Sequence, residues 1–141
     1  MKIESTHIEG LLVITPTIFK DDRGYFFESF NKKTFEEQTK SGIDFVQDNQ
    51  SKSEKNVLRG LHFQNPPFDQ GKLVRVIAGS VLDIAVDIRK NSSTYGQYFK
   101  IVLDTQKHQI LWIPSGFAHG FVSLEDDTIF SYKCTNYYHK D

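Results

Sequence analysis

Short runs of apolar and β-branched residues follow one another along the chain, separated by clusters of Gly, Asn, Asp, Pro and Ser. The runs cover residues 11–19, 24–30, 45–49, 56–64, 72–78, 80–89, 98–104, 109–114, 119–124 and 128–138. Many short strands with turn signals between them are typical of a β-sandwich or a β-barrel. The pattern therefore predicts an all-β fold.

The run at 80–89 alternates clearly between two faces of a strand. One face carries the apolar residues Leu82, Ile84, Val86 and Ile88. The other face carries Asp83, Ala85 and Asp87. Acidic residues on the second face of a strand normally meet water, and we expect solvent there. The alternative is that one carboxylate faces a polar cavity inside a barrel.

Residues 31–42 (NKKTFEEQTKSG) form the one segment with helical character. Asn31 is a good N-cap, the segment is charged throughout, and Gly42 is a typical residue for closing a helix. The sequence therefore predicts a single short helix.

Length and composition narrow the class of protein. The chain has 141 residues, so we expect a single domain over 1–141 with a core of its own. Lys and Arg number 17 against 18 Asp and Glu, which argues against nucleic acid or an acidic membrane surface as a partner. No apolar run approaches the ~20 residues of a membrane helix. Cys134 is the only cysteine and a lone thiol fits a reducing compartment, so we expect a cytoplasmic protein.

The segment IPSGFAHGF contains the pattern P-x-G-x-x-H, filled by Pro114, Gly116 and His119. This pattern resembles the second motif of the cupin superfamily. The fold of that superfamily is a double-sheet, jelly-roll β-barrel, in which the motif brings a histidine into the barrel mouth. The resemblance implies a cupin-type barrel with one short helix.

The first cupin motif is altered at two positions in this chain. His62 corresponds to its first histidine, but Gln64 stands at the second histidine and Lys72 at the glutamate. A metal-binding cupin needs imidazoles and a carboxylate converging on one cation. Because an ammonium beside a divalent cation is electrostatically adverse, we expect no metal and a pocket that favours an anion. A metal-dependent cupin enzyme is the outside alternative.

Read as a whole, the chain resembles the dTDP-4-dehydrorhamnose 3,5-epimerases, a nucleotide-sugar epimerase branch of the cupins. The matching stretches are DDRGYFFESF (21–30), FVQDNQSKS (45–53), VLRGLHFQ (57–64), QGKLVRVIAGSVLDIAVDIRKNSSTYG (70–96), LWIPSGFAHGF (111–121) and SYKCTNYY (131–138). They occur in family order and at family spacing. The resemblance implies a cofactor-independent isomerase of dTDP-L-rhamnose biosynthesis, which epimerises C3 and C5 of a dTDP-linked 4-keto-6-deoxyhexose.

The same resemblance assigns roles to residues of this chain. It makes His62 the general base and Tyr132, on the facing strand, the general acid, and it places Lys72 near the 4-keto oxygen of the sugar. The residues it assigns to the rest of the substrate are Arg59 and His119 at the sugar and pyrophosphate, Arg23, Glu28, Gln47 and Asn49 at the nucleotide, and Phe26 and Tyr138 around base or sugar. It also implies a homodimer with exchanged N-terminal strands and the nucleotide at the interface.

Epimerisation next to a ketone needs these residue types. A histidine with a pKa near 6.5 is largely unprotonated at neutral pH and can remove the proton. An ammonium such as Lys72 stabilises the enolate oxygen that results. A tyrosine held across the ring can return a proton to the opposite face, and arginines can neutralise the diphosphate.

Arg59 and His62 are three residues apart, so a regular strand would point them to opposite faces. Gly60 lies between them, and glycines inside strands often mark β-bulges. We expect a bulge at Gly60 that turns both side chains inward.

Family members usually continue beyond the position of Asp141 with a segment that supplies an aspartate to the catalytic histidine. We expect Asp83 to stand in for that aspartate. Two other functions stay open: a C3-only epimerase, and a weakly active or degenerate protein that only binds the nucleotide sugar.

Overall fold

The structure is a computed structural model that describes residues 1–140. Its strands are β1 (Lys2–Ser5), β2 (Leu12–Thr15), β3 (Phe19–Asp21), β4 (Gly24–Phe26), β5 (Gln47–Ser53), β6 (Leu58–His62), β7 (Lys72–Ala78), β8 (Ser80–Asp87), β9 (Tyr98–Asp104), β10 (Ile110–Ile113), β11 (Phe117–Ser123) and β12 (Thr128–Cys134), and its helix is α1 (Lys32–Thr39). Strands therefore dominate the described residues, as predicted. No helix among them is long and apolar enough to cross a membrane.

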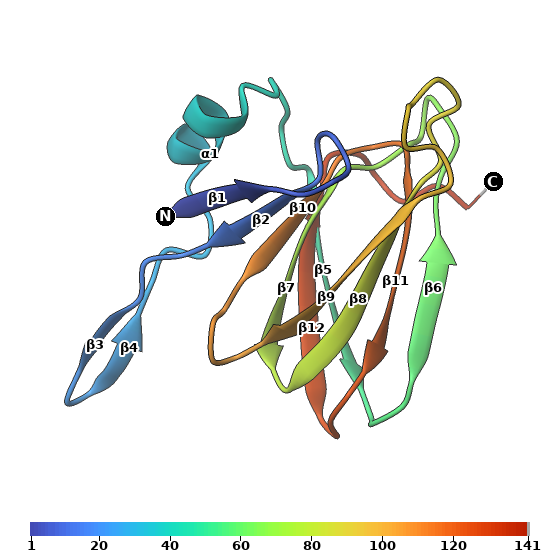
Figure 1. Cartoon of the computed structure of the whole chain (residues 1–141). Helices are drawn as coiled ribbons and strands as arrows, with labels where there is room; N and C mark the ends of the chain where they lie inside the picture. The colour runs from blue at the N-terminus through green and yellow to red at the C-terminus, as the bar shows by residue number, and fades with distance from the viewer. Residues whose placement is uncertain (141) are drawn as a thin grey trace.

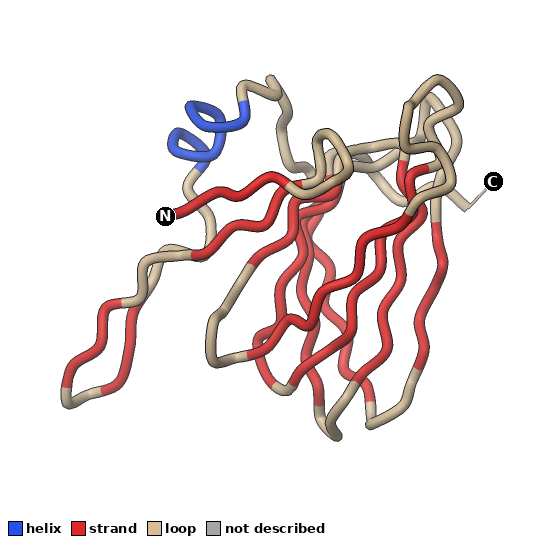
Figure 2. Tube along the Cα trace, viewed as in Figure 1, coloured by secondary structure: helices blue, strands red, loops and turns tan. Residues whose placement is uncertain are grey.

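Two antiparallel sheets face each other and form the barrel (Figure 1). One has six strands in the order β1-β2-β10-β7-β12-β5, and the other has four in the order β6-β11-β8-β9. The hairpin β3–β4 projects away from the barrel, and α1 lies outside the six-stranded sheet (Figure 2). This is the double-sheet cupin-type barrel with one short helix that the family resemblance implied.

The apolar core fills the space between the sheets. Both inner faces contribute fully or almost fully buried side chains: Val74, Val76, Leu111 and Phe130 from the six-stranded sheet, and Val81, Ala85, Leu103 and Phe121 from the other. Burying one larger side chain of this kind stabilises the fold by roughly 1.5–3 kcal/mol. The core therefore holds the two sheets together.

Helix α1 covers the outer face of the six-stranded sheet. Its N-terminus is as predicted, because the side chain of Asn31 accepts a hydrogen bond from the backbone N–H of Thr34 at 3.1 Å. Its end is not at the predicted Gly42: Lys40 takes the left-handed conformation and caps the helix. The buried Phe35 packs edge-on against Trp112, with ring centroids 5.4 Å apart.

The acidic face of β8 points into the barrel, so the expectation that it meets water is wrong. Asp83 and Asp87 are completely buried, whereas the apolar residues between and around them are only half-buried on the outer face. Burying a carboxylate is costly unless charged or hydrogen-bonding partners surround it. Each of the two has such a partner, His119 for Asp83 and Arg89 for Asp87.

Strand β6 contains the predicted bulge. His62 pairs with His119 and Arg59 with Phe121, so three steps along β6 match two steps along β11. Gly60 has a φ of +109°, and a Cβ atom there would lie 2.7 Å from the Cα of Gly120. Only glycine allows this backbone conformation at such a close approach. The extra residue turns Arg59 and His62 toward the same side of the sheet.

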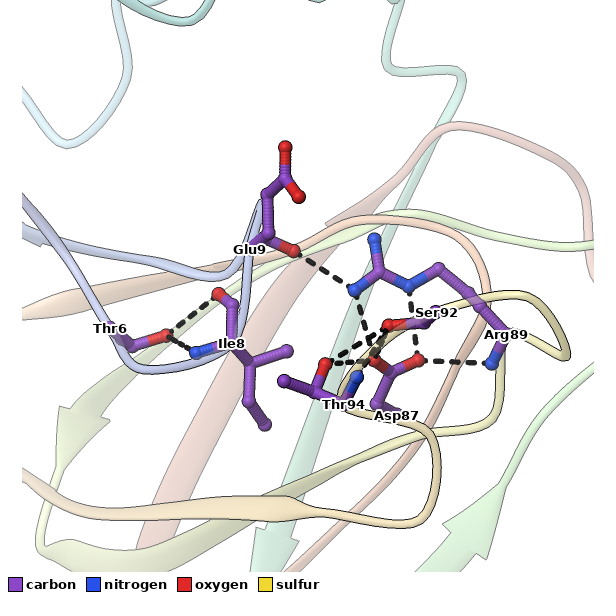
Figure 3. A network of polar contacts seen from close by, with 7 residues as sticks. All are labelled: Thr6, Ile8, Glu9, Asp87, Arg89, Ser92 and Thr94. Atoms are coloured by element: carbon purple, nitrogen blue, oxygen red, sulfur yellow. Dashed lines mark hydrogen bonds and ion pairs between the residues drawn. The ribbon is translucent and has the colours of Figure 1, made fainter.

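Asp87 closes the end of β8 with a dense hydrogen-bond network (Figure 3). Its carboxylate accepts bonds from the guanidinium of Arg89, from the hydroxyl of Ser92 at 2.6 Å and from the hydroxyl of Thr94. Burial by itself would raise the pKa of Asp87, but these bonds hold it well below its usual range. The carboxylate is thus charged at neutral pH and ties the loop at 88–97 to the sheet.

Replacing Asp87 by Asn should lower the free energy of unfolding at pH 7 by about 2–3 kcal/mol. That is less than for a fully buried pair, because the side chain of Arg89 is 32% exposed. Since the pKa of Asp87 is depressed in the folded protein, its stabilisation is complete above the unfolded value of about 4 and is lost as the pH falls below it. Urea denaturation should therefore show a gap between wild type and Asp87→Asn that is constant from pH 8 to 5 and about 1 kcal/mol smaller at pH 3. The exposed Asp127→Asn is the control and should change stability by less than about 0.5 kcal/mol; an equal gap for Asp87→Asn at pH 3 and pH 7 would contradict the assignment.

Candidate active site

A cup opens between the two sheets and consists of two adjoining hollows. The side chains that line both hollows are Asn49, His62, Lys72, His119 and Tyr132. Another hollow lies beneath α1 and is mostly apolar, with none of these residues in its lining. Three of the four residues predicted to do the chemistry, His62, Lys72 and Tyr132, therefore gather in the cup, and Asp83 is not part of its lining.

The two walls of the cup come from different sheets. His62 on β6 and His119 on β11 belong to the four-stranded sheet, whereas Lys72 on β7 and Tyr132 on β12 belong to the six-stranded sheet. The imidazole of His62 and the phenol of Tyr132 thus border one cavity from opposite sides. His62 is exposed at the rim, and His119 is buried deeper in the barrel.

Lys72 brings a partly dehydrated positive charge into the cup. Burial lowers the pKa of its ammonium, while the nearby Cys134 and Asp83 act in the opposite direction. Its Nζ lies 5.5 Å from the centre of the Tyr132 ring. A cation that has lost part of its hydration interacts more strongly with a negative charge on a bound molecule.

Asp83 pairs with His119 and not with His62, so the expectation that it would orient the predicted base is wrong. The Nε2 of His119 and the Oδ2 of Asp83 are 2.7 Å apart, and both side chains are buried. The reason is the strand order: β11 lies between β6 and β8, so Asp83 on β8 reaches the histidine of the adjacent strand. Among residues 1–140 no carboxylate hydrogen-bonds His62, and the second oxygen of Asp83 has no hydrogen-bond partner there.

Arg59 lines the cup beside His62, as the bulge at Gly60 requires. Its Nε donates to the hydroxyl of Ser53 at 2.8 Å, and an Nη donates to the carbonyl of Lys52 at 3.2 Å. These bonds bridge β6 to β5 at the open side of the barrel. A guanidinium has five N–H donors, so further donors remain for an anionic ligand.

Gln64, at the second histidine position of the cupin metal motif, hydrogen-bonds backbone groups of two segments of this chain. Its amide donates to the carbonyls of Phe68 and Tyr137 and accepts a bond from the backbone N–H of His139 at 2.9 Å. The side chain thereby holds residues 137–139 against the 64–68 loop. Residues 1–140 contain no group of three His, Cys, Asp or Glu side chains placed to hold a metal ion. With the amide engaged by backbone and an ammonium in the cup, these donors do not suit a divalent cation.

Two predicted binding residues of β5 are linked to the chain that follows β12. The side-chain amide of Gln47 donates to Asn49 at 3.0 Å, and its oxygen accepts from the backbone N–H of Tyr138 at 3.1 Å. Asn49 and the largely exposed Tyr138 both line the cup. The structure therefore brings these residues to the same opening as His62.

Three other predicted binding residues lie away from the cup of their own chain. Arg23 and Phe26 belong to the projecting hairpin, where Arg23 pairs with Asp21 at 2.7 Å and Phe26 is 67% exposed. Glu28 accepts a hydrogen bond from the side chain of Asn31 at 2.7 Å and borders the hollow beneath α1. Within one chain, none of the three contributes to the lining of the cup.

Sequence reasoning missed part of the wall. Ile88, Gly116 and Phe117 line the cup, and so do Phe63 and Gln70. Gly116 and Phe117 fall inside the segment IPSGFAHGF, so their place beside His119 in the motif was the available signal. The anchoring of Arg59 by Ser53 had no such signal, because it joins two different strands.

Comparisons with known proteins agree with this geometry. A sequence model of the family described as dTDP-4-dehydrorhamnose 3,5-epimerase matches residues 5–141. The enzyme of that name from Salmonella typhimurium is 54% identical over 138 residues, which are 98% of this chain and 75% of the relative.

Two solved structures are similar over nearly the whole chain. The epimerase of Legionella pneumophila in complex with dTDP-4-keto-L-rhamnose has a TM-score of 0.94 and 51% identity, covering 98% of this chain and 73% of that one. The epimerase of Bacillus anthracis with TDP and PPi bound has a TM-score of 0.95 and 43% identity, covering 99% and 80%. The chain belongs to the dTDP-4-dehydrorhamnose 3,5-epimerase family.

Proposed function

We propose that this protein is an isomerase that epimerises C3 and C5 of dTDP-4-dehydro-6-deoxyglucose to give dTDP-4-dehydrorhamnose, in the biosynthesis of dTDP-L-rhamnose. The observation that carries the proposal is the placing of His62 and Tyr132 on opposite sheets, across one cup that also holds Lys72. An epimerase must remove a proton from one face of a carbon and supply one to the other. Groups on facing walls suit that task.

The proposed reaction begins at His62. Its imidazole takes the proton next to the ketone, the C–H bond breaks, and the electron pair moves to give an enolate with its charge on the 4-oxygen. The ammonium of Lys72 stabilises that oxygen. Tyr132 then donates its phenolic proton to the other face of the carbon, which forms the new C–H bond and regenerates the ketone. Exchange with solvent restores the protonation states of His62 and Tyr132.

The remaining residues hold the substrate in this proposal. Arg59 binds the diphosphate with its free guanidinium donors. His119, whose ring Asp83 orients through the 2.7 Å contact, contacts the sugar or the adjoining phosphate. Gln47, Asn49 and Tyr138 contact the nucleotide or the sugar. Residues 1–141 act as one cupin-like domain, and the single buried thiol of Cys134 supports the cytoplasm as its compartment.

We further propose a homodimer with exchanged N-terminal strands. The hairpin β3–β4 carries Arg23 and Phe26 away from the cup of its own chain (Figure 1), and Phe19, Tyr25 and Phe26 expose 61%, 59% and 67% of their surface. Large exposed aromatic residues grouped on one element are typical of a protein interface. Arg23, Phe26 and Glu28 would then contact the nucleotide in the cup of the partner.

His62→Ala should lower solvent-deuterium incorporation at both C3 and C5 by about 10²–10⁴-fold, because it removes the base. Tyr132→Phe should retain much of the exchange and lose most of the epimerised product, since deprotonation survives and reprotonation from the opposite face does not. NMR in D₂O measures both quantities, and the exposed Tyr98→Phe on β9 serves as the control.

Other outcomes of that experiment select the alternatives. Wild-type product labelled at C3 alone would identify a C3-only epimerase. A wild-type protein that dTDP stabilises against heat, but that shows no exchange at high protein concentration, would be a binding protein.

Lys72→Met should lower kcat by about 10²–10³-fold and change the Kd for dTDP much less, because Lys72 is proposed to act at the ketone. Since burial lowers the pKa of Lys72, the rate should fall on the alkaline side below the ordinary lysine value of 10.5. Lys72→Arg keeps its charge to higher pH, so that alkaline limb should move up or vanish. Lys133→Met, on the outer face of the same sheet, is the matched control; a rate loss in the control equal to that of Lys72→Met would remove the specific role.

Mixing two inactive variants tests the exchanged dimer. In a mixture of Arg23→Ala and His62→Ala, half of the randomly assembled dimers are mixed, and each mixed dimer has one intact cup if the hairpin serves the partner. Activity should therefore recover to about a quarter of the wild-type value. No recovery, with mixed dimers demonstrated by native mass spectrometry, would show that the hairpin serves its own chain.

A further inference from the structure

A charged pair lies directly behind one wall of the cup. Gly116 and Phe117 form part of that wall together with Ile88. Arg89 and Asp87 stand behind it, and Arg89 is not among the residues that line the cup. The mechanism proposed above uses neither of these two charged residues.

Arg89 is packed tightly against the back of the wall. The centre of its guanidinium lies 4.8 Å from the centre of the Phe117 ring, which is a cation–π contact. Gly116 has a φ of +94°, and a Cβ atom there would stand 2.5 Å from the Cγ of Arg89. The side chain of Arg89 therefore fills the space into which the wall would otherwise move.

Arg89 is itself held in place from two directions. Asp87 receives two N–H groups of its guanidinium, each at 3.0 Å, in a bidentate pair. The same Nη also donates to the carbonyl of Glu9, at 3.0 Å, in the loop between β1 and β2. Figure 3 shows these bonds meeting at the arginine, while the hydroxyls of Ser92 and Thr94 donate to Oδ2 of Asp87, the oxygen that also accepts from this Nη. The guanidinium is thus anchored to the end of β8 and to the loop between β1 and β2.

The Gly116–Phe117 wall leads along β11 to His119, which also lines the cup. In the ladder between β8 and β11, Phe117 pairs with Asp87 and His119 with Ala85. Phe117 and His119 are two residues apart on β11, so both point to the inner face. Ile88 also donates its N–H to the carbonyl of Gly116 at 3.1 Å. A shift of Phe117 would therefore displace the start of β11 and, with it, the ring of His119.

We propose that Arg89, anchored by Asp87 and by the Glu9 carbonyl, is a positioning residue. It fixes the Gly116–Phe117 wall and His119, and so keeps the sugar ring in register between His62 and Tyr132. This inference rests on the proposed epimerase function. A misplacement of about 1 Å at a reacting centre can lower a rate by about 10²-fold, so the clamp should act on turnover more than on nucleotide affinity.

The test compares Arg89→Met and Arg89→Lys with wild type, well below their unfolding temperatures. Arg89→Met keeps the length of the side chain but loses every polar contact; its kcat should fall about 10–100-fold, with the Kd for dTDP within about 3-fold of wild type. Arg89→Lys keeps the charge but not the bidentate geometry, and its kcat should lie between those of wild type and Arg89→Met. The double variant Asp87→Asn/Arg89→Met should lose little more kcat than Arg89→Met alone, because the pair acts as a unit.

Val81→Ala is the control for a merely structural effect. It opens a cavity in the core at the other end of β8, and it should lower Tm by about 5 °C while leaving kcat near the wild-type value. Equal kcat values for wild type and Arg89→Met, or a loss in Val81→Ala as large as in Arg89→Met, would overturn the inference. An inactive wild type would instead overturn the proposed function.

Discussion

The inner face of the β8–β11 pair is the constraint on which the rest of this structure depends. Along β8 the inward residues change from Val81 to Asp83, Ala85 and Asp87, so the barrel interior is apolar at one end and charged at the other. Buried carboxylates are tolerated only with partners. His119 and Arg89 supply them from the adjacent strand and loop. The packed apolar end holds the sheets together, and the charged end leaves room for a polar cup.

The cup obtains its chemistry from the separation of the two sheets. Because each sheet contributes its own groups, His62 and Tyr132 border the same cup from different sheets, which is the arrangement that the proposed reaction requires. The bulge at Gly60 adds Arg59 to the wall that carries His62. The partly dehydrated ammonium of Lys72 provides positive charge inside the cup.

The predicted binding residues fall into two sets according to where they lie relative to the cup. One set, Gln47, Asn49, Arg59, His119 and Tyr138, surrounds or supports the cup of its own chain. The other set lies away from the cup: Arg23 and Phe26 on the projecting hairpin, and Glu28 beside the hollow beneath α1. A hairpin of two short strands with exposed aromatic residues has little stabilisation of its own in water. In the proposed homodimer, a second subunit would cover these aromatic residues.

Local pattern in the sequence was sufficient to predict the all-β class, the bounds of β7 and β9, the Asn31 cap and the bulge at Gly60, because each leaves a signal in the residue types of one short segment. The family resemblance was sufficient to bring together His62, Lys72, His119 and Tyr132. The inward face of β8, the end of α1 at Lys40 and the partner of Asp83 were decided only by tertiary structure. Alternation shows that two faces of a strand differ, but which one is buried depends on the partners that other strands supply; Asp83 meets His119 because β11, and not β6, lies next to β8.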